Sequence, residues 1–481
     1  MSKLEQWKNS KRRKPLLLRG ARQVGKTWVL VEFGRDQYEN IAYFNFEQDA
    51  EYQQFFKLTK EPKRIIENLM AASAQPIFPG KTLVIFDEIQ ACPEAISSLK
   101  YFCEDASEYH VACAGSLLGL ALAHPDSFPV GKVNVMDLYP MTFFEFLEAC
   151  GDESLAAYIA DVKDLVPLPD AFFNPLVEKL RIYFLTGGMP EAVLTWVEGK
   201  DVKALQEILA DLLVLYELDF QKHASSSLFP KIGMVWRSIP AQLARENKKF
   251  LYSVVRESAR GREFEDAVQW LVNADLLVKV MRVSKPGLPL SSYDETRAFK
   301  LYLLDVGLLR RLSSLAPSAI TEGNRLFTEF KGALAENYVL QELLPQLDLS
   351  PRYWAIDNPH YEVDFIIQLD NDIIPVEVKA GENVKARSLR KYREKYADAT
   401  PIAVRLSLRN LSFDGSVLNI PLFMAGQLGR LVGLARAEQR GESKPNKESL
   451  EAIKETKELI ASGHPGYDSL DDMIKGMDIE C

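Results

Sequence analysis

The sequence predicts an α/β protein whose first part is a parallel β-sheet covered by helices on both faces. Apolar, strand-like runs recur with helical stretches between them, and this alternation is typical of such a sheet. The runs occupy residues 15–19, 41–46, 82–86, 111–114 and 133–139. A glycine-rich segment follows the first run and an acidic pair follows the third, so polar residues gather where parallel strands end and α/β sheets bind ligands.

The glycine-rich segment at residues 20–27, G-A-R-Q-V-G-K-T, carries the clearest chemical signal. It stands between an apolar run and a helix-like stretch, which is the order that a phosphate loop requires. Its glycines let the backbone bring amide N–H groups against phosphate oxygens. We expect Lys26 to reach the β- and γ-phosphates of ATP and the Thr27 hydroxyl to bind Mg²⁺. The residues expected to bind the nucleotide are Gly20, Ala21, Arg22, Gln23, Val24, Gly25, Lys26 and Thr27.

The acidic pair Asp87 and Glu88 ends a continuous apolar run, which is typical of a strand buried on both faces. We expect Asp87 to hold the Mg²⁺ shell through water and Glu88 to orient or deprotonate the attacking water. The alternative is an acidic strand end that faces solvent. Ser116 follows the next apolar run, where it would touch the γ-phosphate or the water, although a plain strand-to-helix turn predicts the same residue.

Composition limits the classes of protein that remain. The 481 residues suggest about three domains at about 150 residues each. The net charge of −9 excludes a constitutive polyanion binder, so any nucleic-acid contact must come from a local patch. The longest charge-free apolar run, residues 111–123, is too short to span a bilayer. The five cysteines show no metal-ligand spacing, and we expect a cytoplasmic protein without a membrane segment.

The chain after the first sheet divides by pattern. Residues 1–140 hold the sheet, and residues 141–225 are mostly helical and should form a lid on it. Residues 226–318 show two helical stretches, at 250–258 and 262–275, followed by two strands, which is the order of a winged helix-turn-helix. This unit is locally basic, but carboxylates on its second helical stretch disfavour base readout, so we expect it to pack on the sheet unit or to touch only the DNA backbone.

Residues 326–435 carry a second constellation, and residues 436–481 follow as a linker and an acidic tail. Period-two alternation along residues 361–367 places Val363, Phe365 and Ile367 on one face of a strand and Asp364 on the other. In the next strand, Glu377 and Lys379 share a face. Over three hundred positions separate them from the phosphate loop, so we expect a separately folded unit with its own core.

Asp364, Glu377 and Lys379 form the D…E-x-K pattern of PD-(D/E)xK nucleases, with Glu336 added from a helix-like stretch. We expect Asp364 and Glu377 to bind Mg²⁺ with Glu336 supporting them, and Lys379 to orient the attacking water. A basic stretch at residues 385–395 would carry contacts to the DNA backbone. Folds of this kind also serve as inert binding modules, and that alternative stays open.

Residues 15–140 resemble an AAA+-type ATPase core. More narrowly, the chain resembles a large prokaryotic family of ATPases with a C-terminal domain of unknown function, similar to the restriction-endonuclease-like fold. The stretches that carry the resemblance are 20–27, 86–90, 114–116, 138–146 and 185–190. The resemblance implies a P-loop ATPase with its Gly187–Pro190 segment near the nucleotide, although an ordinary helix-linking turn explains that segment equally well.

One departure from the family bears on assembly. Where such proteins often have Gly-Arg before the last core strand, this chain has Gly131 and Lys132. Lysine lacks the forked guanidinium donors of arginine, so we do not assign an arginine-finger role to Lys132. The resemblance implies that an arginine of a neighbouring subunit meets the γ-phosphate, and we therefore expect an ATP-dependent homo-oligomer. The function expected is ATP hydrolysis coupled to a nuclease-like domain that acts on DNA. The alternative is a nucleotide-dependent regulatory switch whose C-terminal domain only binds DNA or protein.

Overall fold

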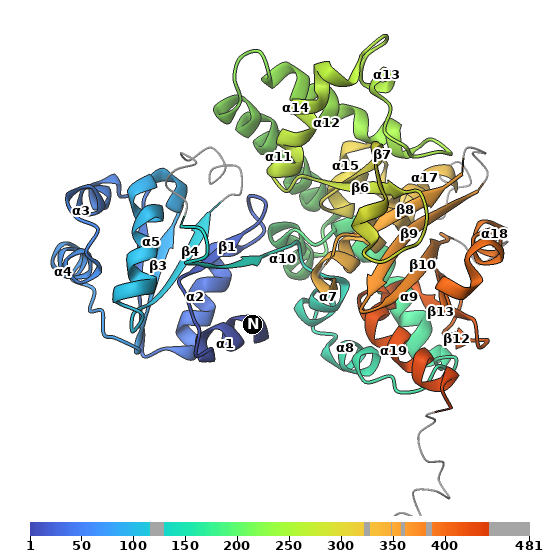
Figure 1. Cartoon of the computed structure of the whole chain (residues 1–481), viewed down its shortest axis with the longest axis horizontal. Helices are drawn as coiled ribbons and strands as arrows, with labels where there is room; N and C mark the ends of the chain where they lie inside the picture. Colours follow the sequence, from blue (N-terminus) through green and yellow to red (C-terminus); the bar gives the residue numbers. More distant parts are fainter. Residues whose placement is uncertain (116–128, 322–327, 348, 357–360, 381–386, 442–481) are drawn as a thin grey trace, which may run out of the picture.

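The computed structural model of the chain describes residues 1–115, 129–321, 328–347, 349–356, 361–380 and 387–441. In Figure 1 an N-terminal unit, drawn in blue, lies beside a larger body that contains the rest of the described chain. None of the helices in these ranges is both long enough and apolar enough to cross a bilayer.

The N-terminal unit is built on five strands in the order β2-β3-β4-β1-β5, with every neighbouring pair parallel. The strands are β1 (Leu16–Arg19), β2 (Asn40–Asn45), β3 (Thr82–Asp87), β4 (His110–Gly115) and β5 (Asn134–Asp137). The accompanying helices are α1 (Ser2–Asn9), α2 (Lys26–Gln37), α3 (Gln53–Leu58), α4 (Pro62–Ser73) and α5 (Pro93–Asp105). The α/β class and the parallel sheet predicted from the sequence are therefore confirmed.

Alternate residues of these strands feed two apolar cores, one on each face of the sheet. Leu17, Val84 and Cys113 pack with side chains of α3, α4 and α5. Leu16 and Ile85 pack on the other face with side chains of α1 and α2. Because both faces are covered, the strands read as continuous apolar runs instead of alternating ones.

The region expected to be a helical lid contains five helices in its described part. These are α7 (Phe143–Ala149), α8 (Glu153–Ala160), α9 (Asp170–Thr186), α10 (Pro190–Gly199) and α11 (Val202–His223). Helix α7 starts with a capping box, in which Thr142 accepts from the Glu145 backbone and Glu145 accepts from the Thr142 backbone. The turn between α9 and α10 is made by Gly187, Gly188 and Met189.

The next region runs through helices into a β-hairpin. It contains α12 (Phe229–Leu243), α13 (Tyr252–Val255), α14 (Gly261–Asn273), β6 (Leu277–Val283), β7 (Asp294–Leu303), α15 (Val306–Leu312) and α16 (Pro317–Thr321). The helix expected at residues 250–258 is only the single turn α13. The two strands that the sequence predicts after these helices are present as β6 and β7, and they pair antiparallel.

That hairpin is part of a larger sheet of eight strands, in the order β12-β13-β11-β10-β9-β8-β6-β7. The remaining strands are β8 (Arg352–Ala355), β9 (Glu362–Leu369), β10 (Asp372–Val378), β11 (Ala403–Ser407), β12 (Ser412–Phe413) and β13 (Val417–Pro421). Helices α17 (Thr328–Leu343), α18 (Arg387–Tyr396) and α19 (Leu428–Gln439) accompany them. The join is a parallel pair between β6 and β8, in which Met281 faces Arg352.

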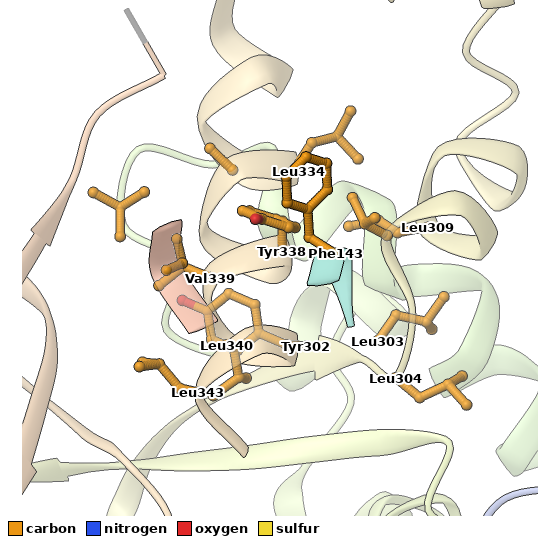
Figure 2. Close-up of a cluster of buried hydrophobic side chains, with 14 of the residues drawn as sticks. Phe143, Tyr302, Leu303, Leu304, Leu309, Leu334, Tyr338, Val339, Leu340 and Leu343 are labelled. Atoms are coloured by element: carbon orange, nitrogen blue, oxygen red, sulfur yellow. The ribbon is translucent and has the colours of Figure 1, made fainter. Parts of the chain in front are cut away.

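The expectation that residues 326–435 have a core of their own is wrong. One apolar cluster contains side chains from α9, α12, β7 and α17 together with those of β10 and β11. Figure 2 shows its centre, where side chains of α17 lie among those of α7, β7 and α15. The labelled residues are Phe143, Tyr302, Leu303, Leu304, Leu309, Leu334, Tyr338, Val339, Leu340 and Leu343. The physical reason is the β6–β8 pair, which makes one sheet out of two predicted units.

The prediction that Val363 lies on the same face of strand β9 as Phe365 and Ile367 is also wrong. Phe365 and Ile367 lie in the large cluster, but Val363 packs with Trp354 and Tyr392 in a separate cluster. The β8–β9 pairing shifts register at this point. An irregularity of this kind inserts an extra residue and reverses the facing of the side chains beyond it, which strict alternation cannot anticipate.

Candidate functional site

The phosphate loop lies between β1 and α2 and passes close to the chain that leaves β5. A Cβ atom on Gly20 would lie 2.3 Å from the carbonyl oxygen of Leu138, so only glycine fits there. Gln23 and Gly25 both have positive φ, at 64° and 91°. This loop ends at the N-terminus of α2, where unpaired backbone N–H groups favour an anion.

Lys26 is the first residue of α2, and its ammonium group folds over the loop. The Nζ atom donates to the carbonyl oxygens of Gly20 at 3.0 Å and Ala21 at 2.8 Å. Burial lowers the pKa of Lys26, and the nearby carboxylates of Glu88 and Asp87 act in the opposite direction. The group is thus a partly desolvated cation, which interacts more strongly with phosphate than a cation in bulk water does.

Thr27 and Asp87 are brought together although they lie on different elements. The Thr27 hydroxyl donates to Asp87 Oδ2 at 2.9 Å. Tyr43 of β2 donates to the same oxygen at 2.6 Å, and the Glu88 backbone N–H donates to Asp87 Oδ1 at 3.0 Å. The Asp87 carboxylate is 4% exposed and held on both oxygens, so its orientation is fixed.

Glu88 follows directly and has a left-handed backbone, with φ at 49°. Its side chain accepts a hydrogen bond from the amide group of Gln90. The carboxylate is therefore restrained beside Asp87 at the carboxyl end of β3. Ser116, expected near the same place, lies outside the described residues.

The C-terminal part of α11 lies over the phosphate loop. Tyr216 donates to the backbone oxygen of Arg22 at 2.9 Å, and the Arg22 guanidinium lies 3.2 Å from Asp219 and 3.1 Å from His223. A cleft of about 210 Å³ is lined by the loop and by this helix. The lid region thus contacts the loop directly. Lys132, by contrast, pairs with Glu104 at 2.7 Å.

The second predicted constellation is also gathered in space, at α17 and the end of β10. The Val378 backbone N–H donates to Asp364 Oδ2 at 2.8 Å, and the Lys379 ammonium lies 3.1 Å from Glu377 Oε1. Asp364, Glu377 and Glu336 are all buried. We call the group Glu336, Glu362, Asp364, Glu377, Lys248, Lys300 and Lys379 the charged cluster.

Lysines from outside the predicted motif neutralise Glu336. Lys248 lies 2.6 Å from Glu336 Oε1, Lys300 lies 3.9 Å from Oε2, and Tyr302 donates to Oε2 at 3.0 Å. Burial opposes ionisation of Glu336, but the two ammonium groups outweigh it and lower its pKa. Burial, with Glu336 adding to it, raises the pKa of Asp364 to about 7.

The carboxylates of Asp364 and Glu377 are better placed to bind a metal ion than the carboxylate of Glu336. Glu336 has both oxygens engaged, whereas Glu377 Oε2 is buried with no hydrogen-bond partner in the described structure. Magnesium commonly uses one or two protein carboxylates and keeps several waters. Asp364 and Glu377 fit that pattern. The described ranges contain no group of three or more histidine, cysteine, aspartate or glutamate side chains arranged to hold a metal.

Residues 12–147 match the family model described as an AAA domain. The N-terminal unit is an AAA-type ATPase domain. Two further models match the chain, both described as domains of unknown function: DUF8612 at residues 177–319 and DUF4143 at residues 331–423. The AAA domain implies that the chain binds a nucleotide, and its P-loop lies within the matched residues. No curated protein in the comparison matches the chain.

Among solved structures, the Walker-type ATPase of Pyrococcus abyssi is 16% identical, covers 65% of this chain and 93% of its own, and has a TM-score of 0.41. The RuvB Holliday junction branch migration motor of Thermotoga maritima is 14% identical over 57% of this chain and 85% of its own, with a TM-score of 0.25. PCH-2 of C. elegans is 13% identical, covers 42% of this chain and 62% of its own, and has a TM-score of 0.26. These TM-scores are too low to carry an argument.

Several side chains at the AAA domain site were missed by the sequence reasoning. Tyr43 could have been found from the strand pairing. Strands β2 and β3 are parallel neighbours in which Asn45 pairs with Asp87. Tyr43 lies two residues before Asn45, on the same face of β2, and is therefore close to Asp87. Gln90 lies in the stretch that carries the family resemblance. Asp219 and His223 of α11 have no local signal, since only the packing of the helix brings them to Arg22.

Proposed function

We propose that this protein binds ATP and hydrolyses it with Mg²⁺ at the site formed by the phosphate loop, Asp87 and Glu88. The observation that carries the proposal is the 2.9 Å hydrogen bond from the Thr27 hydroxyl to Asp87. A hydroxyl and a fixed carboxylate at this place suit the hard oxygen coordination of Mg²⁺. The ammonium group of Lys26 lies over the loop and would bind the phosphates.

Each residue has a separate role in this proposal. Residues 20–27 hold the phosphates through their backbone N–H groups and Lys26. Thr27 would hold Mg²⁺ directly and Asp87 through water, and the bound ion would neutralise charge on the phosphates. Glu88 orients or deprotonates the attacking water, and Gln90 restrains its carboxylate.

The test separates phosphate binding by Lys26 from activation of the attacking water by Glu88. Lys26→Ala should abolish binding of a fluorescent ATP analogue, whereas Glu88→Gln should keep binding and lose hydrolysis by about a hundredfold or more. Lys132→Ala is the matched control, because Lys132 lies outside the phosphate loop and pairs with Glu104. Equal loss of binding in Lys26→Ala and Glu88→Gln would assign Glu88 a structural role instead.

A second candidate function concerns the charged cluster. We propose that Asp364 and Glu377 hold Mg²⁺ and that Lys379 orients water for cleavage of a DNA phosphodiester. The unpartnered Glu377 Oε2 and the adjacent Lys379 favour it. Because Lys248 and Lys300 already neutralise Glu336, that residue supports the cluster instead of binding the ion.

Nuclease assays on single- and double-stranded DNA, with Mg²⁺ or Mn²⁺ and with or without ATP, test this candidate. Cleavage by the wild type that is lost in Lys379→Ala, while DNA binding persists, supports it. Lys203→Ala of α11 is a control in which a surface lysine outside the charged cluster is removed instead, since the Lys203 side chain is 87% exposed and its ion pair with Glu207 is 3.9 Å long. No cleavage by the wild type favours the nucleotide-dependent switch, in which the C-terminal half only binds DNA or protein.

A further inference from the structure

The start of α10 lies beside the phosphate loop. A Cβ atom built on Gly25 would lie 3.5 Å from Pro190 Cγ, so the ring of Pro190 faces the Gly25 backbone across a gap that one methyl group would fill. The carbonyl oxygen of Gly188 accepts from the Met141 backbone at 2.7 Å. We call residues 187–190 the linker turn. The linker turn therefore lies next to the loop that would bind the nucleotide.

One buried carboxylate holds the linker turn in place. Asp305 lies between β7 and α15 and is 0% exposed. Its Oδ2 atom accepts from the Gly188 backbone N–H at 2.6 Å, while Oδ1 accepts from the Leu308 backbone N–H at 2.9 Å. A Cβ atom on Gly187 would lie 2.1 Å from Oδ1, so glycine is required for the carboxylate to come this close.

Gln341 extends this contact to α17. Its amide group donates to Asp305 Oδ2 at 3.1 Å and to the Tyr183 hydroxyl at 2.8 Å, and its Oε1 accepts from the Val306 backbone at 3.0 Å. The same helix carries Glu336 in the charged cluster. Figure 2 shows apolar side chains of α7, β7 and α15 packed around those of α17, so this helix is held in a close-packed core.

The Asp305 contacts exceed what helix capping requires. As the N-cap of α15, Asp305 needs only the bond that its Oδ1 atom accepts from the Leu308 backbone N–H. The second oxygen is shared by the linker turn and by Gln341. A buried charge is costly unless its hydrogen bonds are complete, and burial does raise the pKa of Asp305. An uncharged cap such as serine would cap the helix without that cost, but it could not hold the turn.

We propose that Asp305 is a positioning residue for ATP binding, which holds the linker turn against the phosphate loop and ties that turn through Gln341 to α17. The inference rests on the proposed ATPase function. Asp305 touches neither the phosphate loop nor the reacting atoms, and it acts through Gly188 and Pro190. The order of contacts is phosphate loop, Pro190, Gly188, Asp305, Gln341 and then Glu336 along the same helix.

The first test is Asp305→Asn. An amide has only one accepting oxygen, so an N–H group must face either Leu308 or the pair of donors from Gly188 and Gln341. We expect the Kd for a fluorescent ATP analogue and the KM for ATP to rise about tenfold, while kcat falls less than about threefold. A purely structural loss would lower the active fraction, hence kcat, without changing KM.

Asn410→Ala is the control for the loss of partly buried hydrogen bonds elsewhere in the chain. Asn410 exchanges two bonds of 2.8 Å with the Leu168 backbone, and no bond of Asn410 with the linker turn is present in the described residues. This variant should lower the melting temperature and leave the Kd unchanged. Pro190→Ala is the second variant, because it removes the ring that faces the Gly25 backbone, and it should raise the Kd about threefold.

Each outcome decides something. Wild-type affinity in both Asp305→Asn and Pro190→Ala overturns the inference and leaves the ATPase proposal standing. A wild-type protein that binds no ATP overturns both. If Asp305→Asn does not fold, Pro190→Ala decides alone: a raised Kd supports the positioning role and an unchanged Kd overturns it.

Discussion

Lys300 is the most deeply buried cation of the charged cluster. Its side chain is 0% exposed, it pairs with Glu362, and its ammonium lies 3.9 Å from Glu336 and 4.8 Å from the centre of the Tyr353 ring. Burial disfavours the charged form, but the carboxylates of Glu362 and Glu336 outweigh it and raise the pKa of Lys300 to about 12. The lysine therefore stays charged at every pH at which the protein would be handled.

Replacement of Lys300 by methionine keeps most of the volume and removes the charge. It leaves Glu362, whose side chain is 15% exposed, without its partner. Removal of one partner from a buried ion pair typically costs about 3–5 kcal/mol. The Lys81–Glu39 pair is the control, since its side chains are 58% and 65% exposed and such pairs contribute about 0–1 kcal/mol.

Urea unfolding followed by tryptophan fluorescence measures both variants. We expect Lys300→Met to lose several times the free energy of unfolding that Lys81→Met loses. Adding Glu362→Gln to Lys300→Met should recover part of the loss, because the carboxylate is no longer left unpaired. A Lys300→Met loss within 1 kcal/mol of the Lys81→Met loss, or a double variant that is no more stable than Lys300→Met, would refute the reasoning.

Three other outcomes are expected. Burial raises the pKa of Glu342 to about 8, so the folded protein favours the protonated carboxyl and its stability falls as pH rises toward and through that value. Relative to Glu342→Gln, the wild type should lose about 4 kcal/mol of unfolding free energy between pH 5 and pH 9 in urea unfolding. The same pH dependence of the unfolding free energy in both proteins would contradict this. Tyr43→Phe removes one of the donors to Asp87 Oδ2, and kcat for ATP hydrolysis should fall about three- to tenfold, whereas an unchanged kcat would make the bond irrelevant. Glu88→Gln with saturating ATP should form oligomers in light scattering, and a persistent monomer counts against shared arginine supply.

The sheet of the AAA domain could be predicted because its signals are local. Strands buried on both faces are continuous apolar runs, and parallel pairing brings their carboxyl ends to one edge. Thr27 and Asp87 meet for that reason alone, although they are far apart in the chain. The same kind of local pattern predicted the presence of β6, β7, β9 and β10, although it did not give their pairing.

The remainder depended on packing between distant segments. Nothing in the sequence near Lys248 or Lys300 indicates that both reach Glu336, because they come from a loop and a strand of a different predicted unit. The sequence analysis did not single out Asp305, because its Oδ2 atom is engaged only when Gly188 and Gln341 are packed beside it. Val363 was misplaced because a register shift is invisible in an alternating pattern.

The parallel pair between β6 and β8 also sets the order in which the chain can be completed. During synthesis β6 can pair with β7 at once, but its other edge stays open until β8 has emerged. An open strand edge is a template for pairing with another chain. A chain that stops before residue 352 would therefore leave the backbone N–H and C=O groups on one edge of β6 unpaired, and we expect such fragments to aggregate. A chain cut after α19 still contains β8, so that edge of β6 stays paired.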